Sequence, residues 1–299
     1  MNIAKKIEYF IFRGLSSFVR ALPIGAVRAF ARSIAWIVFY VLRIRRNVTV
    51  MQIRRALPEK TEKEVLAIAY GSFVNLVTTI CELLWSPNIT RTLCNTLVDH
   101  QDLDVLMQAH KRGSGVIFLC GHFGNWEWLI GSLPLGHGLP TAAIVRPMQN
   151  LYVDALVETI RENAGVQVIL AHRAVRETIA FIRARGIVGI LTDQSAPRDS
   201  FFVPYFGIPA STYAGPAHFA LKTGAAVIMA HCIRQKDGNY IVKCEEIPTN
   251  DLHDASEENL RTLTLRHVQA LERVVRLYPE QWLWQHKRWK HAPADGNGL

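Results

Sequence analysis

The 299-residue sequence predicts an α/β fold, with a mixed, mostly parallel sheet covered by helices and a further helical region at the N-terminus. Two observations predict the sheet and its cover. Short apolar runs alternate with stretches of helical spacing from residue 116 onward, the pattern of strands joined by helices. The run at 116–119 is apolar without interruption, as expected of a strand that is covered on both faces.

The N-terminal region, residues 1–55, is both basic and apolar. Its only acidic residue is Glu8, and its net charge is +10, whereas the whole chain carries +9. Cations mixed with aliphatic and aromatic side chains suit an anionic membrane surface. An arm that binds nucleic acid rarely carries so much aliphatic surface. We therefore expect a basic, amphipathic membrane anchor and no nucleic-acid partner.

The longest uncharged run in this region, residues 33–42, is short for a spanning helix, which needs about 20 residues. Arg43, Arg45 and Arg46 close the run without a small-residue cleavage site, so a signal peptide is not expected. We expect an anchor that lies on the membrane or marginally spans it, with its basic end facing the cytoplasm. A buried core helix is the alternative.

Residues 60–86 have apolar positions at helical spacing and predict one or two helices, with Thr61 as the N-cap. After the run at 116–119, the strand candidates are 141–145, 166–170, 187–192, 226–232 and 240–244. The helix candidates are 151–163, 173–185, 215–223 and 257–277. The residues from Pro293 onward have the composition of a loose tail.

The cysteines indicate neither a disulfide framework nor a zinc knuckle. Their number, five, is odd and no C-x-x-C pair occurs, so we expect the main domain in the cytosol. Cys120 lies two positions before His122, but a cysteine that ends a buried strand is more often a packing residue than a nucleophile.

The most informative stretch is V-I-F-L-C-G-H-F-G-N-W-E-W at 116–128, which presents His122 and Glu127 five positions apart after the predicted strand. Ligands of open α/β sheets bind at this carboxyl end. A neutral histidine can take a proton from a hydroxyl, and a carboxylate on its other nitrogen fixes the tautomer. The pair can meet if His122 precedes the helix and Glu127 lies in its first turn.

The residues between them suit that arrangement. Gly124 tolerates unusual backbone angles, Asn125 is a good N-cap, and the N–H groups of a helix start can stabilise developing negative charge. By spacing alone, a hydrogen-bonded core histidine is an equal alternative. The helix-borne H-E-x-x-H pattern is absent, so we expect no metal at this site.

Polar residues also follow two other strand candidates. Asp193 follows 187–192, and it reaches the same sheet edge as His122 if the two strands are parallel neighbours. A turn aspartate is the alternative reading. Arg146 follows 141–145 and offers a planar fork for phosphate, with a surface arginine as the alternative.

Two apolar segments lie further along the chain. Phe202, Tyr205 and Phe206 belong to a segment at 201–213 that is too apolar for an ordinary loop. It could line a tunnel, face a bilayer or close the core. Near the C-terminus, tryptophans alternate with basic residues at 282–291, which suits a membrane interface, and a helix packed on the domain is the alternative.

Five ordered blocks together resemble a known family: GHFGNWE at 121–127, VRP at 145–147, DQS at 193–195, FVPYFG at 202–207 and WLWQHKRWK at 282–290. They are similar to blocks of the bacterial lipid A biosynthesis acyltransferases, the lauroyl/myristoyl branch of the lysophospholipid acyltransferase superfamily. The resemblance spans most of the chain.

This resemblance implies transfer of a fatty acyl group from acyl carrier protein, or less often coenzyme A, to a hydroxyl of a lipid A precursor, without a cofactor. It implies His122 as general base and Glu127 as its partner, with Arg146 and Asp193 in the cleft. Residues 202–207 would shape the acceptor or acyl groove. Backbone donors near Gly121 to Asn125, including those of Gly124 and Asn125, would stabilise the oxyanion.

The expected organisation is an anchor at 1–55 and an acyltransferase domain at 56–299, at the cytoplasmic face of the bacterial inner membrane. Acylation of another glycolipid or of a lysophospholipid is the alternative within the same chemistry. A hydrolase is disfavoured because no G-x-S-x-G elbow occurs. A non-catalytic membrane-binding protein, with an incidental His122, is a further alternative.

Overall fold

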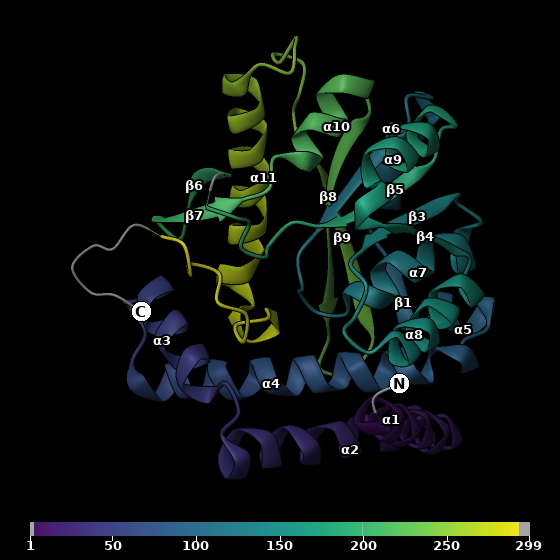
Figure 1. The fold of residues 1–299 in the computed structure, drawn as a ribbon, viewed down its shortest axis with the longest axis vertical. Coiled ribbons are helices and arrows are strands. Elements are labelled where there is room, and N and C mark those ends of the chain that lie inside the picture. The colour runs from purple at the N-terminus through teal and green to yellow at the C-terminus, as the bar shows by residue number, and fades with distance from the viewer. Residues whose placement is uncertain (1–2, 199, 293–299) are drawn as a thin grey trace.

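The computed structural model describes residues 3–198 and 200–292, so the predicted tail from Pro293 lies outside the described residues (Figure 1). In this part of the chain, a seven-stranded sheet has the order β1-β9-β8-β2-β5-β3-β4. Its strands are β1 (Val98–His100), β2 (Val116–Cys120), β3 (Thr141–Val145), β4 (Val166–Leu170), β5 (Ile187–Leu191), β8 (Ala226–Arg234) and β9 (Tyr240–Glu246).

The pairing of the strands confirms the predicted mixed, mostly parallel sheet. Strands β8, β2, β5, β3 and β4 run parallel to one another. Strand β9 pairs with β8 in the antiparallel sense, and β1 runs parallel to β9. A separate antiparallel hairpin is formed by β6 (Phe201–Tyr205) and β7 (Ile208–Thr212).

Helices cover the sheet on both faces (Figure 1). Along β2, Ile117 and Leu119 join one apolar cluster, whereas Val116, Phe118 and Cys120 join another. This alternation confirms a strand that is buried on both sides. Cys120 is packed within it, as predicted, and burial raises the pKa of its thiol far above the usual range.

The helices that precede β5 are α1 (Ile3–Ala21), α2 (Ile24–Trp36), α3 (Arg46–Ala56), α4 (Glu62–Trp85), α5 (Arg91–Leu97), α6 (Leu103–Lys111), α7 (Trp126–His137), α8 (Leu151–Asn163) and α9 (Ala174–Arg183). Those that follow it are α10 (Gly215–Thr223) and α11 (Glu257–Leu277). Every helix and strand candidate from the sequence therefore corresponds to an observed element.

Helix α4 runs across the carboxyl ends of the central strands (Figure 1). It begins with the predicted N-cap Thr61, which forms a capping box with Glu64. From α4, Asn75 and Thr79 both donate to the carbonyl oxygen of Gly124, just beyond the end of β2. Helix α2 packs along α4, so α4 lies between the sheet edge and the N-terminal helices.

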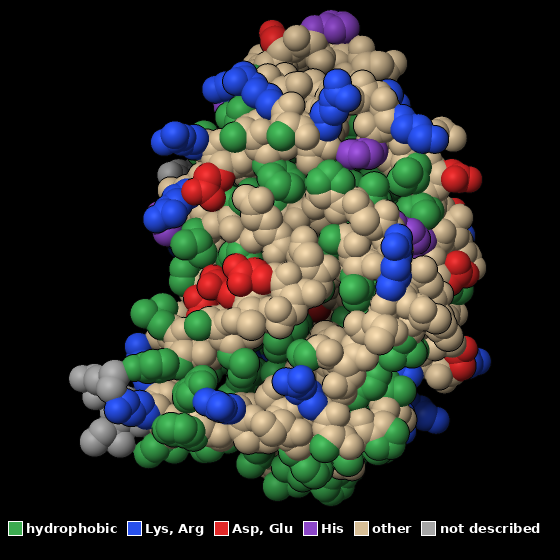
Figure 2. All heavy atoms as spheres, turned by 90° about the vertical axis from the view of Figure 1, so that its right-hand side faces the viewer, with side chains coloured by type: hydrophobic (Ala, Val, Ile, Leu, Met, Phe, Trp, Pro, Cys, Tyr) green, Lys and Arg blue, Asp and Glu red, His purple; other side chains and the backbone are tan. Residues whose placement is uncertain are grey.

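Within the described residues, two helical stretches are long and apolar enough to cross a membrane, Ile24–Leu42 and Glu62–Asn88; 22% and 50% respectively of their apolar 18-residue windows are buried. The first is α2 extended by a π-helical turn, η1 (Ile37–Leu42). Figure 2 shows apolar side chains gathered at the end of the molecule where α1 and α2 lie. The exposed large apolar residues of the N-terminal region are Ile7, Phe10, Ile11, Phe18, Trp36, Ile37, Tyr40, Val41, Leu42, Ile44 and Met51.

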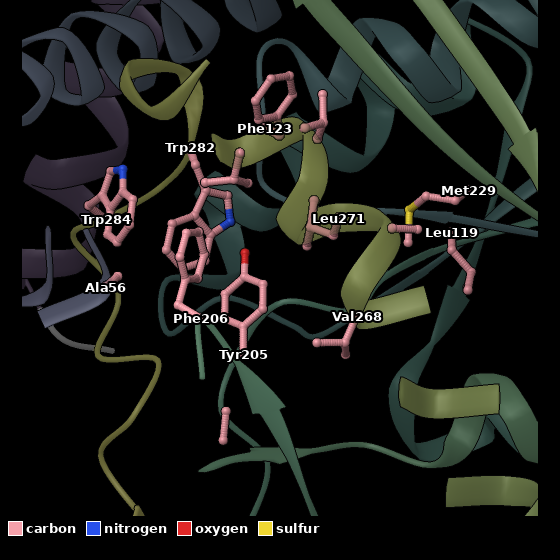
Figure 3. Packing of buried hydrophobic residues seen from close by; sticks show 14 of the residues in the cluster. Ala56, Leu119, Phe123, Tyr205, Phe206, Met229, Val268, Leu271, Trp282 and Trp284 are labelled. Carbon is pink, nitrogen blue, oxygen red and sulfur yellow. The ribbon is translucent and has the colours of Figure 1, made fainter. Parts of the chain in front are cut away.

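The C-terminal tryptophans do not face a membrane. Trp282, Trp284 and Trp289 are each at most 2% exposed and pack against Tyr205 and Phe206; Figure 3 labels Tyr205, Phe206, Trp282 and Trp284. The interface expectation for 282–291 is therefore wrong. Burying large aromatic surface in the core stabilises the fold more than leaving it at the surface.

Candidate active site

His122 and Asp193 meet at the carboxyl edge of the sheet, as predicted. Strands β2 and β5 are parallel neighbours, with Cys120 opposite Leu191, so the residues that follow them emerge side by side. Nδ1 of His122 lies 2.7 Å from Oδ1 of Asp193. The backbone N–H of His122 and the indole N–H of Trp282 donate to Oδ2 at 2.7 and 2.8 Å.

This environment keeps the Asp193 carboxylate charged. Burial alone would raise its pKa, but the nearby imidazole of His122 and the N–H donors of His122 and Trp282 hold the pKa at about 2. An ionised carboxylate at Nδ1 selects the tautomer with its proton on that nitrogen. Nε2 of His122 then carries the lone pair that can accept a proton; the side-chain amide of Gln194 lies 3.4 Å from it, and the His122 side chain keeps 14% exposure.

Glu127 pairs with another residue. It lies in the first turn of α7, and Asn125 is the N-cap, accepting from the backbone N–H of Trp128 at 2.9 Å, both as predicted. The carboxylate of Glu127, however, accepts two hydrogen bonds from Arg161 of α8, at 2.7 and 3.0 Å. The expected His122–Glu127 pair is therefore not confirmed, because a bidentate guanidinium holds the acid while Asp193 occupies Nδ1.

The backbone N–H groups of the turn from His122 to Asn125 are already bonded to other parts of the protein. The N–H groups of Phe123, Gly124 and Asn125 donate to the carbonyl oxygens of Gly121, Gln281 and Cys232. This corrects the expectation that these groups are free for an oxyanion. The contacts instead show that Gly124 and the fully buried Asn125 hold the turn in place.

A buried charge cluster anchors this turn to the helices below it. Glu82 of α4 is completely buried and accepts hydrogen bonds from Arg28, Arg234, Asn125 and Tyr240. Arg28 belongs to α2, whereas Arg234 and Tyr240 belong to β8 and β9. A single carboxylate therefore joins an N-terminal helix, two strands and the turn that carries His122.

Replacing Gly124 with alanine is expected to destabilise the protein by at least about 3 kcal/mol, as overpacking and backbone strain add up. Gly124 has φ +55°, and an added Cβ would lie only 1.7 Å from the carbonyl oxygen of Cys232. Gly138→Ala is the matched control, because its φ is +67° but nothing lies within 4 Å of the added Cβ. Urea unfolding measures both, and equal losses would show that the close approach at Gly124 is unimportant.

Tyr205 and Phe206 are packing residues. They are 1% and 6% exposed, and the ring centroids of Tyr205 and Trp282 lie 5.5 Å apart (Figure 3). Phe202 is partly buried in β6. The segment therefore closes the core, which was one of the alternatives, rather than lining a groove through Tyr205 and Phe206. Because Trp282 also bonds Asp193, this aromatic cluster supports the site indirectly.

Arg146 directly follows β3 at the same sheet edge and is exposed. It donates to the hydroxyl of Tyr213 at 2.6 Å, and its guanidinium lies 5.1 Å from the centroid of that ring. No carboxylate within residues 3–198 and 200–292 forms an ion pair with it. Its remaining donors are consistent with the expected phosphate contact.

Two narrow apolar cavities, of about 40 Å³ each, lie beside the site. The first is lined by Cys120 and Trp126, which flank His122, and by β3 and β5. The second lies between α5, α7 and α8. Glu127 and Arg161 line both cavities, so their ion pair stands between the two. The ring of Trp126 packs 5.1 Å from the imidazole of His122.

Comparison with known proteins identifies the family of this chain. Residues 2–291 match the model of one family, the bacterial lipid A biosynthesis acyltransferases. The chain belongs to this family. The match covers nearly the whole chain, which confirms the resemblance that the sequence blocks indicated.

The chain also matches several individual acyltransferases, each at low sequence identity and over part of its length. The chain is 26% identical to a phosphatidylinositol mannoside acyltransferase of Mycolicibacterium smegmatis, covering 64% of this chain and 62% of that protein. It is 25% identical to the lipid A biosynthesis palmitoleoyltransferase of Escherichia coli, covering 67% and 64%. It is 28% identical to the lauroyltransferase of the same organism, covering 62% and 59%. The matched region thus spans less than two thirds of each relative.

In this family member, sequence reasoning missed three residues near His122 and Glu127. Nε2 of Gln194 lies 3.4 Å from Nε2 of His122. Nε2 of His286 accepts from the backbone N–H of Ser195 at 3.2 Å, and burial lowers its pKa to about 4, so it is neutral. Gln194 sits inside the DQS block and could have been found there, whereas Arg161 stands in a helix without any motif.

Proposed function

We propose that this chain transfers a fatty acyl group from acyl carrier protein, or from coenzyme A, to a hydroxyl of a lipid A precursor. The observation that carries the proposal is the His122–Asp193 pair, which lies at the carboxyl edge of the sheet in a member of this acyltransferase family. A buried, ionised acid on Nδ1 and a free Nε2 form the arrangement that a general base for an alcohol requires.

The proposed reaction uses the free nitrogen of His122. Nε2 takes the proton of the acceptor hydroxyl while the oxygen attacks the thioester carbonyl, and Asp193 stabilises the imidazolium that forms. Collapse of the tetrahedral intermediate breaks the C–S bond, and the imidazolium returns the proton to the leaving thiolate. The amide of Gln194, beside Nε2, is the donor that we assign to the oxyanion.

Other residues are assigned to substrate binding. Arg146, exposed at the same edge, would bind a phosphate of the pantetheine arm or of the lipid head group. The two narrow apolar cavities mark the direction in which we assign the acyl chain, and both would have to widen to admit it, with Glu127 and Arg161 in their shared wall. Glu127 then acts by shaping this wall with Arg161, and Asp193 takes the orienting role first expected of Glu127.

The exposed apolar surface of α1 and of Ile24–Leu42 supports a location on the membrane. We assign residues 1–55 to the anchor and 56–299 to the acyltransferase domain, at the cytoplasmic face of the bacterial inner membrane. Basic residues in the anchor would contact the anionic lipid surface there.

A second acceptor is supported by one comparison. The chain is about as similar to the mannoside acyltransferase as to the two lipid A enzymes, with identities of 26%, 25% and 28%. A phosphorylated glycolipid other than a lipid A precursor is therefore the alternative acceptor for the same chemistry.

Incubation of the purified protein with labelled acyl carrier protein and a lipid A precursor is expected to yield acylated lipid. A parallel reaction with phosphatidylinositol mannoside tests the alternative acceptor. Free fatty acid without product lipid would identify a hydrolase instead. Absence of both, with acyl coenzyme A as well, would leave a membrane-binding protein and contradict the proposal.

A further inference from the structure

A basic pocket lies where the exposed apolar helix ends. It is an open depression of about 580 Å³, lined by Arg43, Ile44 and Arg45 of the turn between η1 and α3, by Asn47 and Val48 in the first turn of α3, and by Lys287. The C-terminal segment reaches this place because Gln52 of α3 bonds the carbonyl oxygens of residues 284 and 286. Cations that are far apart in the sequence therefore share one pocket.

These cations have no acidic partner within the described part of the chain. No carboxylate there forms an ion pair with Arg43, Arg45 or Lys287, and all three are exposed. The contact made by Arg43 is a 3.4 Å hydrogen bond to the carbonyl oxygen of Tyr40. Three like charges around one depression repel one another and favour a bound anion.

The backbone around the pocket is held in an unusual conformation. Arg43 and Arg45 have φ values of 52° and 60°, in the left-handed region that side chains other than glycine rarely adopt. Such strain concentrates at functional sites. Helix α3 begins here, and its N-cap Arg45 makes no side-chain cap, so the start of α3 adds partial positive charge to the same place.

The hydrocarbon surface beside the pocket indicates what the anion is attached to. Trp36, Ile37, Tyr40, Val41 and Leu42 are 44–60% exposed and lead directly into Arg43. Aromatic rings at the end of an apolar helix, followed by arginines, are typical of the depth at which lipid phosphates lie. A phosphate that carries hydrocarbon chains therefore fits both surfaces at once.

We infer that the pocket formed by Arg43, Arg45, Lys287 and the start of α3 binds the head-group phosphate of an anionic membrane phospholipid. This inference rests on the proposed membrane location of the chain, and it adds a specific lipid site separate from His122. The bound phosphate holds the end of α2 at the level of the head groups.

Vesicle co-sedimentation of the full chain tests this inference. We compare phosphatidylcholine vesicles with vesicles that also contain phosphatidylglycerol, for the wild type and for the triple variant R43Q/R45Q/K287Q. The triple variant is expected to bind the phosphatidylglycerol vesicles about a hundredfold more weakly, since each cation near such a surface contributes about fivefold. Binding to phosphatidylcholine alone, which the apolar helices provide, should change little.

The matched control is R176Q/R183Q/K222Q, which removes the same charges from α9 and α10. These helices lie at the other end of the molecule from α2 (Figure 1). The control should lose less than about threefold in affinity. Inorganic phosphate should release the wild type from phosphatidylglycerol more than chloride does at equal ionic strength. Circular dichroism establishes that all variants are folded.

Three outcomes would overturn the inference. The triple variant could keep the wild-type preference for phosphatidylglycerol, or the control could lose as much as the triple variant. Alternatively, the triple variant could raise the KM for the lipid acceptor in neutral detergent, which would assign the pocket to the substrate instead. Vesicle binding does not require acyl transfer, so failure of the proposed reaction would leave this result interpretable.

Discussion

Replacing Asp193 with asparagine is expected to reduce acyl transfer about a thousandfold, with a much smaller effect on the KM for the acceptor. The amide cannot stabilise an imidazolium, and it can present its NH2 group to Nδ1 of His122, which moves the imidazole proton to Nε2. The base would then be protonated on the nitrogen that must accept the proton. Steady-state transfer of a labelled acyl chain measures the change in kcat.

The decisive comparison is with Glu127→Gln and His122→Ala. His122→Ala should abolish transfer, a loss at least as large as that of Asp193→Asn, while the fold and membrane association remain. Glu127→Gln should retain far more activity, because its carboxylate contacts Arg161 rather than the imidazole. If Glu127→Gln lost a thousandfold while Asp193→Asn stayed near the wild-type rate, the originally expected His122–Glu127 dyad would be restored.

Replacing Glu82 with alanine is expected to lower the free energy of unfolding by about 3–5 kcal/mol. The change would leave the largely buried guanidinium groups of Arg28 and Arg234, 12% and 17% exposed, without the fully buried carboxylate that pairs with both. It would also free the side chain of Asn125, which holds the turn before α7. Urea unfolding measures the loss.

Glu62→Ala is the control for this experiment. Glu62 also bonds an arginine, Arg54, but both side chains are more than half exposed. Exposed ion pairs contribute little, so this variant should unfold at nearly the wild-type urea concentration. Similar midpoints for the two variants would mean that the Glu82 cluster does not stabilise the fold.

Local patterns were sufficient to predict six of the seven strands of the sheet and the helices α4 and α8 to α11, but not β1, α5, α6 or the β6–β7 hairpin. The apolar run at 116–119 and the Thr61 cap are properties of short segments, so they could be read without tertiary contacts. The shared sheet edge of His122 and Asp193 followed from a rule about parallel neighbours, whereas the direct contact between their side chains was not predicted. Which acid reaches the imidazole depends on side-chain direction, and Arg161, 34 positions after Glu127, decided that.

The environment of the tryptophans could not be read from composition either. Alternating rings and cations at 282–291 fit a membrane interface or a core equally well by hydropathy. Their burial follows from Tyr205 and Phe206, which a hairpin about 80 residues earlier brings against them.

Helix α4 lies between the N-terminal helices and the sheet edge, so it determines how far His122 stands from a membrane that contacts α2. If α2 rests in the lipid, the imidazole of His122, our proposed base, stands about one helix thickness, on the order of 10 Å, above the hydrocarbon. The head-group sugar of an acceptor lipid could then reach the imidazole of His122 while the acyl chains of that lipid stay in the bilayer. Catalysis would not require the lipid to be extracted from the bilayer.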